Sequence, residues 1–186
     1  MKDGITDLEK KNPSNEEHEN FQTFEKIVNR ETTKADAPLA IEIKNNIPIY
    51  SGQLVRDCAN LFERKQELLT EWSSVFESGA GIIAISNAIE NTSVIDIATT
   101  NFEEIIISEK LNGNVGDHFA KPGANDRIWN SLQKHCMKDP QNFIDYYCSE
   151  AIALASEAWL GPNYQVTAQV NRVNPGGKAQ KAHRDY

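Results

Sequence analysis

The sequence lacks the features that mark several classes of protein. Its 186 residues include only three cysteines, and 27 acidic side chains against 19 basic ones leave a net charge of −8. Cys58, Cys136 and Cys148 have no C-x-x-C spacing, which favours buried, reduced thiols over a disulfide framework. A chain of this charge is repelled by nucleic acid and by anionic membranes, so we expect neither as a partner.

Long apolar runs are also missing. No run approaches the roughly 18 apolar residues that a membrane-spanning helix needs. The first twenty residues contain only Met1, Ile5 and Leu8 as large apolar side chains, so they show no signal-peptide core. We therefore expect a cytoplasmic protein whose partners are small molecules or other proteins.

Charge is concentrated at the start of the chain. Of residues 1–35, 14 are charged, which predicts a solvated, flexible arm over residues 1–40. Within it, Phe21, Phe24, Ile27 and Val28 have helical spacing. The arm is therefore either solvated throughout or contains a short amphipathic helix that docks on the main body.

Residues 41–186 read as one α+β unit, in which helical and strand patterns are both present. Helices are predicted from Ser51 to Val75, from Thr92 or Ser93 to Asn112, and from Ile128 to Cys136. Asp139 and Pro140 favour the start of a further helix that runs to Gly161. Strands are predicted at 41–43, 82–85 and 164–174, before the break at Pro175-Gly176-Gly177.

The residues best suited to chemistry are His183 and Asp185. Side chains at i and i+2 of an extended chain lie on one side, so both can reach the same cation. With a distant second histidine they would form the 2-His-1-carboxylate triad that holds non-haem Fe(II). H-x-D alone is a weak motif, because about 0.2 copies are expected by chance in a chain of this composition.

The surrounding residues make the motif more specific. The stretch YQVTAQVNRVNPGGKAQKAHRDY at 164–186 resembles the phytanoyl-CoA dioxygenase family of Fe(II)- and 2-oxoglutarate-dependent oxygenases, especially its bacterial members. The stretches GDHFAKPGANDRIWNSLQK at 116–134 and EAIALASEAWLGP at 150–162 are similar to the same family. The resemblance covers roughly residues 80–186.

The resemblance implies a double-stranded β-helix, the jelly-roll barrel of cupins, preceded by packed helices. Residues 41–186 would then be the helical portion and first strands of the dioxygenase domain. His183 and Asp185 match the first two iron ligands, and the cofactors would be Fe(II), 2-oxoglutarate and O₂. The family's distal histidine and the basic residue that binds 2-oxoglutarate lie downstream of this motif, and the 186 residues end before either.

Other candidates rest on residue type and position. Gln169 and Asn171 are candidates for polar contacts with the co-substrate, with an ordinary exposed strand face as the alternative. Lys121, Arg127 and His118 are candidates for contacts with an anionic substrate, with solvated surface as the alternative. His135 adjoins Cys136 on a predicted helix, where neighbouring side chains diverge, so we expect no metal role there.

Three functions are compatible with these residues. The first is the N-terminal portion of a dioxygenase that hydroxylates a small organic substrate and converts 2-oxoglutarate to succinate. The second is a non-catalytic remnant or binding module, which would expose open strand edges and self-associate through them. The third is a cupin-like protein that binds another divalent metal.

Overall fold

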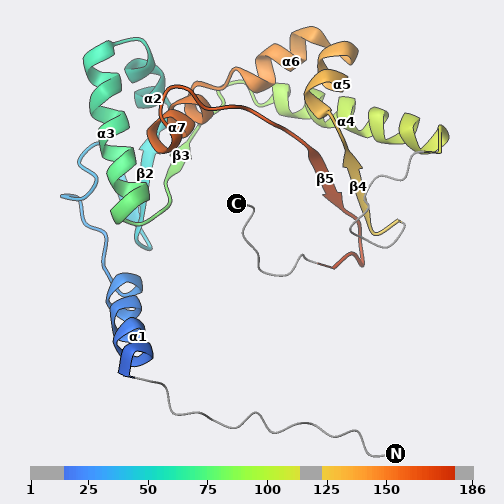
Figure 1. Cartoon of the computed structure of the whole chain (residues 1–186). Helices are drawn as coiled ribbons and strands as arrows, with labels where there is room; N and C mark the ends of the chain where they lie inside the picture. The colour runs from blue at the N-terminus through green and yellow to red at the C-terminus, as the bar shows by residue number, and fades with distance from the viewer. Residues whose placement is uncertain (1–14, 114–122, 179–186) are drawn as a thin grey trace, which may run out of the picture.

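Helices dominate the computed structural model, which also contains two small sheets (Figure 1). It describes residues 15–113 and 123–178. The predicted α+β class is confirmed. The elements are, in chain order, α1 Asn15–Val28, β1 Glu42–Lys44, β2 Ile47–Ser51, α2 Gly52–Ala59, α3 Phe62–Ser78, β3 Ala84–Ser86, α4 Ser93–Leu111, β4 Asn125–Ile128, α5 Ser131–Lys138, α6 Pro140–Tyr147, α7 Glu150–Leu160 and β5 Val170–Val173.

The first sheet has the order β1-β2-β3. β1 and β2 form an antiparallel hairpin, and β3 adds in parallel on the other side of β2. Asn45 and Asn46 connect the hairpin with φ values of 51° and 66°. Asparagine tolerates this left-handed conformation better than most residues, and two such residues favour the tight turn that joins antiparallel strands.

The core beside this sheet is formed by α2, α3 and α7. Trp72 and Tyr50 are fully buried, and their rings meet edge to face with centroids 5.4 Å apart. Helix α7 packs against both α3 and α2. Its small residues Ala151 and Ala158 are buried in the same cluster, which lets the helices approach closely. Ala37 and Ala40 also belong to this cluster, so packing of the chain against the body begins before β1.

A second apolar cluster lies between α4 and the second sheet. Phe102, Ile105 and Ile106 of α4 pack against Ile128, which is fully buried at the end of β4. Val170 of β5 packs at the edge of the same cluster. This contact holds the β4–β5 pair against α4.

Two predicted helices are each divided in two. The helix expected from Ser51 to Val75 breaks at Asn60, whose side chain donates to the Arg56 carbonyl, while Leu61 is extended. The helix expected from Asp139 to Gly161 ends at Tyr147, and Ser149 begins a new one by accepting from the Ile152 N–H. In both places a short polar side chain bonds to the backbone and ends or begins a helix. The predicted caps Ser51 and Asp139 are confirmed.

Two further predictions about the second half of the chain are corrected. Ile128 was expected to begin a helix, but it ends strand β4, and α5 begins at Ser131 after Asn130 with a φ of 54°. The predicted strand over 164–174 is regular only at Val170–Val173. In both cases pairing between β4 and β5, more than 40 residues apart, decides the conformation.

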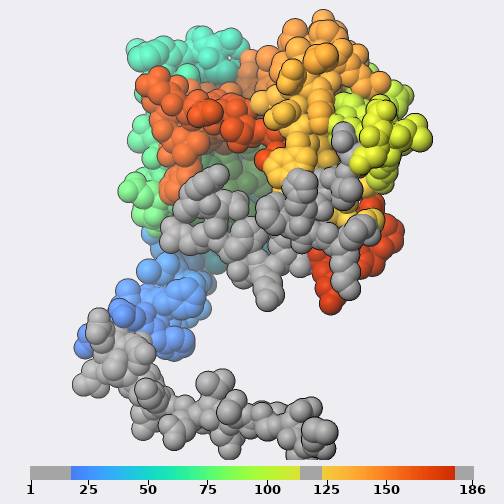
Figure 2. Space-filling model, turned by 45° about the vertical axis from the view of Figure 1, so that its right-hand side comes forward, coloured from blue at the N-terminus to red at the C-terminus, as the bar shows by residue number. Residues whose placement is uncertain are grey.

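Residues 15–28 of the charged arm form helix α1, which projects away from the body (Figures 1 and 2). None of the described helices is long and apolar enough to cross a lipid bilayer.

Candidate functional site

The candidate residues that the structure describes lie on or beside the β4–β5 strand pair, which precedes the H-x-D motif in the sequence. The strands are antiparallel, with Arg127 opposite Asn171 and Asp126 opposite Arg172. Residues directly opposite one another extend from the same face of a sheet, and successive residues alternate between the faces. The pair therefore has two chemically different faces.

One face packs on α4 and combines apolar and ionic side chains. Ile128 and Val170 pack in the apolar cluster between α4 and the second sheet. Asp126 lies two residues before Ile128 and is therefore on the same face. Arg172, opposite Asp126, is bonded to it through two nitrogens. This face anchors the strand pair.

The other face contains two of the predicted site residues. The register brings Arg127 and Asn171 opposite each other, and the Arg127 guanidinium lies 5.0 Å from the centre of the Trp129 ring. A cation over an aromatic ring is stabilised by the ring's negative face and is held in a defined orientation. Gln169 directly precedes β5 and is exposed. The structure thus places Arg127, Asn171 and Gln169 on or beside one strand pair.

Asp126 is the centre of the ionic contacts and is only 2% exposed. Its Oδ1 lies 2.6 Å from Lys110 Nζ of α4, and its Oδ2 lies 2.7 Å from Arg172 Nη2. Asn174 donates to the same Oδ2 over 3.1 Å. Three residues, from α4, β5 and the segment after β5, therefore converge on the carboxylate of Asp126 in β4.

These contacts determine the charge state of Asp126. Burial alone would raise the pKa of its carboxyl group, but the hydrogen bonds from Lys110, Arg172 and Asn174 outweigh burial. The pKa falls from its ordinary value of 3.8 to about 2. The carboxylate is therefore ionised at neutral pH and holds two cations and an amide at the end of β5.

The turn after β5 is fixed to the start of β4. Asn174 donates from its backbone N–H to the Ala124 carbonyl over 3.0 Å and from its side chain to the Gly123 carbonyl over 3.1 Å. Gly177 donates to the Asn174 carbonyl. A Cβ atom on Gly177 would lie only 2.8 Å from the Ala124 oxygen, so only glycine fits this close approach. The turn after β5 is thus held against the start of β4 as far as Gly177.

Two buried polar residues of α5 hold the surrounding elements. Ser131 donates from Oγ to the Ala168 carbonyl over 2.8 Å, which ties α5 to the segment before β5. His135 is fully buried, with its Nε2 2.8 Å from Asn142 Oδ1 and its ring against Phe102. Asn142 donates in turn to the Val94 carbonyl of α4. These contacts give His135 a packing role that joins α4, α5 and α6.

Four predicted site residues lie outside the described part of the chain. They are the metal ligands His183 and Asp185 and the substrate candidates His118 and Lys121. Within residues 15–113 and 123–178, no three His, Cys, Asp or Glu side chains gather closely enough to hold a metal ion. The predicted iron ligands therefore stay a prediction from sequence.

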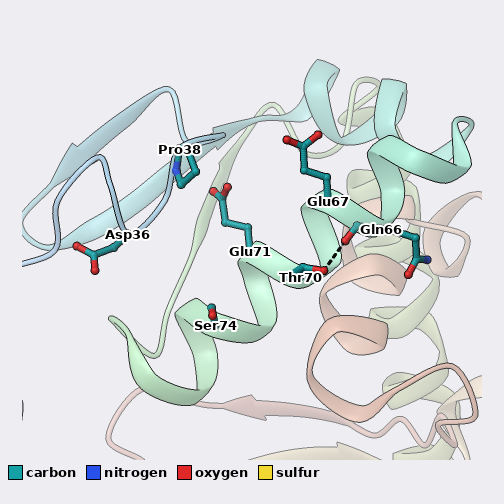
Figure 3. A pocket seen from close by; sticks show the side chains of 7 residues that line it. All are labelled: Asp36, Pro38, Gln66, Glu67, Thr70, Glu71 and Ser74. Carbon is teal, nitrogen blue, oxygen red and sulfur yellow. Dashed lines mark hydrogen bonds between the residues drawn. The ribbon is translucent and has the colours of Figure 1, made fainter.

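A shallow pocket beside α3 also gathers acidic side chains (Figure 3). Glu67 and Glu71 lie on successive turns of α3, and Asp36 lies apart from both, bonded to Arg30. Glu71 accepts hydrogen bonds from the Tyr50 hydroxyl over 2.8 Å and from the Leu39 N–H. Burial, followed by the contact with Glu71, raises the pKa of Tyr50 well above its usual range. Both Glu71 oxygens thus serve to hold β2 and the segment before β1 against α3.

We predict that Glu71→Ala lowers the free energy of unfolding by about 2 kcal/mol, because the buried Tyr50 hydroxyl and the Leu39 N–H lose their acceptor. Glu67→Ala is the matched control, since Glu67 lines the same pocket but is exposed. Urea denaturation measures both. Equal effects of the two substitutions would show that Glu71 is not a structural acceptor.

Sequence reasoning missed the residues that fix this site. Asp126, Arg172 and Asn174 are ordinary polar residues of a loop and a strand, and 46 residues separate Asp126 from Arg172. The only available signal was the alternation of β5, which places Val170 and Arg172 on one face. That pattern identifies a shared face but not the partner across it.

The chain was also compared with known proteins. No family model, curated protein or solved structure matches it.

Proposed function

We propose that this chain belongs to an Fe(II)- and 2-oxoglutarate-dependent dioxygenase that hydroxylates a small organic substrate. The observation that carries the proposal is the H-x-D motif at His183 and Asp185, within a stretch that resembles the phytanoyl-CoA dioxygenase family. In this proposal β4 and β5 are early strands of a double-stranded β-helix.

The described residues support the proposal through the strand that precedes the motif. β5 ends at Val173, ten residues before His183, and its antiparallel partner β4 holds it on α4. The contacts of Asn174 and Gly177 fix the direction of the chain after the strand. A metal site needs ligands on a rigid support, and in this proposal the strand pair would serve as that support.

Each proposed site residue has a chemical role. The imidazole of His183 and the carboxylate of Asp185 would hold the metal. Arg127 presents a planar cation and Asn171, opposite it, an amide, a combination suited to a carboxylate of the co-substrate or substrate. Gln169 adds a second amide, and His118 and Lys121 would add positive or polar groups toward an anionic substrate.

Fe(II) and 2-oxoglutarate would supply the oxidising chemistry when bound: O₂ and 2-oxoglutarate are consumed, succinate and CO₂ are released, and one C–H bond of the substrate becomes C–OH. The protein's own residues orient the reactants and exclude water. Among the 186 residues no counterpart is assigned to the family's distal histidine or to its 2-oxoglutarate-binding basic residue.

Succinate formation from 2-oxoglutarate by the complete dioxygenase to which this chain is proposed to belong, under air with Fe(II), tests the proposal. We expect turnover that requires Fe(II) and stops on chelation. Absence of turnover, with normal folding by circular dichroism, would favour the non-catalytic binding module. Preferential retention of zinc or nickel after anaerobic reconstitution, without dependence on 2-oxoglutarate, would favour another metal protein.

A further inference from the structure

Helix α1 has an apolar face with four large side chains. Phe21, Phe24, Ile27 and Val28, here called the apolar stripe, lie along one side of the helix, and each is more than half exposed. A 14-residue helix is marginally stable in water on its own. Burial of the apolar stripe would supply the stabilisation that this helix needs.

The body of the same chain has an apolar hollow of about 400 Å³. It lies between the C-terminal ends of α3 and α7 and is here called the α3–α7 groove; it is lined by Phe76, Gly81, Ala155, Ser156, Trp159 and Leu160. Trp159 and Leu160 are 59% and 61% exposed, although Trp159 meets Phe76 edge to face. An apolar helix face can fit into a hollow that is lined by aromatic and leucine side chains.

The attachment of α1 to the body decides which groove it can reach. Arg30 donates from Nη1 to the Ser78 carbonyl over 2.6 Å, and its Nη2 pairs with Asp36. The backbone N–H groups of Asn29 and Arg30 still bond to carbonyls of the last helical turn. Helical hydrogen bonding therefore continues up to Arg30, the residue that is bonded to Ser78 of the body. The helix projects outward from this point (Figures 1 and 2). To fold back onto the chain's own groove, the helix would have to turn about Arg30, whose side chain these bonds hold.

We propose that the protein forms a two-fold symmetric dimer in which α1 of each copy lays its apolar stripe in the α3–α7 groove of the other. Burying four large side chains at on the order of 100 Å² each gives about 400 Å² per helix. Two helices and the two groove surfaces that they cover make roughly 1,600 Å² in total, the size of a standard stable interface. The reciprocal arrangement closes the assembly at two copies.

Sedimentation equilibrium of the full chain tests the dimer. We expect wild type to be dimeric at micromolar concentration and Phe24→Asp to weaken the dimer at least 100-fold, because two charges enter each assembly. Gln22→Asp is the matched control, since it adds the same charge on the opposite side of α1. In the groove, Leu160→Asp should also give monomers, whereas Ile152→Asp, at another exposed apolar residue of α7, should not.

A mixture of the Phe24→Asp and Leu160→Asp variants sharpens the test. The first retains its groove and the second retains its apolar stripe, so the mixture should form a heterodimer through one intact contact. Circular dichroism confirms that each variant is folded. The proposal would be overturned if wild type stayed monomeric at a concentration 100-fold above micromolar. It would also be overturned if the dimer persisted in both the Phe24→Asp and the Leu160→Asp variant. A monomer that expands on Phe24→Asp would indicate docking on the chain's own groove and would also overturn it.

Discussion

Replacing His183 or Asp185 by alanine is expected to lower Fe(II)-dependent succinate formation at least ~100-fold, because each substitution removes one of the ligands that would hold the metal. Millimolar 2-oxoglutarate should not restore the rate. The defect is loss of the protein's hold on the metal, which additional co-substrate cannot replace. Initial rates at saturating 2-oxoglutarate, with and without added Fe(II), measure the effect.

Matched controls separate loss of a ligand from loss of a charge or a ring. His18→Ala removes an exposed histidine of α1, and Asp145→Ala removes an exposed carboxylate of α6. Both variants should retain wild-type rates. If the His183 and Asp185 variants also retain them, the H-x-D motif is not the metal site.

Asp126→Ala is expected to lower the free energy of unfolding by about 3 kcal/mol, because it removes a buried carboxylate that pairs with two cations. The value lies at the low end for a broken buried pair, since Lys110 and Arg172 are partly exposed and can regain water. Glu103→Ala is the control, because Glu103 contacts Arg172 only at 3.5 Å on an exposed surface. Chemical denaturation at pH 7 measures both variants.

The pH dependence of this effect follows from the low pKa of Asp126. A pKa lowered from 3.8 to about 2 on folding contributes stability that is fully present above about pH 4 and is lost as the pH falls toward 2. The difference in stability between wild type and Asp126→Ala should therefore narrow between pH 4 and pH 2. A difference that stays constant over this range would show that Asp126 is not held as an ionised group.

Local chemistry allowed part of the fold to be predicted from sequence. The caps Ser51 and Asp139 and the helix from Ser93 to Asn112 depend on residues within one or two turns, and the structure contains all three. The divided helices at Asn60 and Ser149 were missed because apolar spacing continues through both breaks. The turn at Asn45-Asn46 was a usable signal that the prediction did not include.

The candidate site was predictable only in outline. The alternation around Asn171 indicated a strand, and Arg127 was proposed on residue type alone. Their juxtaposition depends on the β4–β5 register, which short-range patterns do not encode. The same is true of Asp126, whose partners come from α4, β5 and the segment after it.

The most direct test of the iron-site proposal is the Fe(II) content of the complete dioxygenase to which this chain is proposed to belong, after anaerobic equilibrium dialysis with 2-oxoglutarate. We predict about one Fe(II) per chain for wild type and for His18→Ala, and strongly reduced iron for His183→Ala and Asp185→Ala. Equal iron content in all four proteins, or none in wild type, would contradict the proposal that His183 and Asp185 bind the metal.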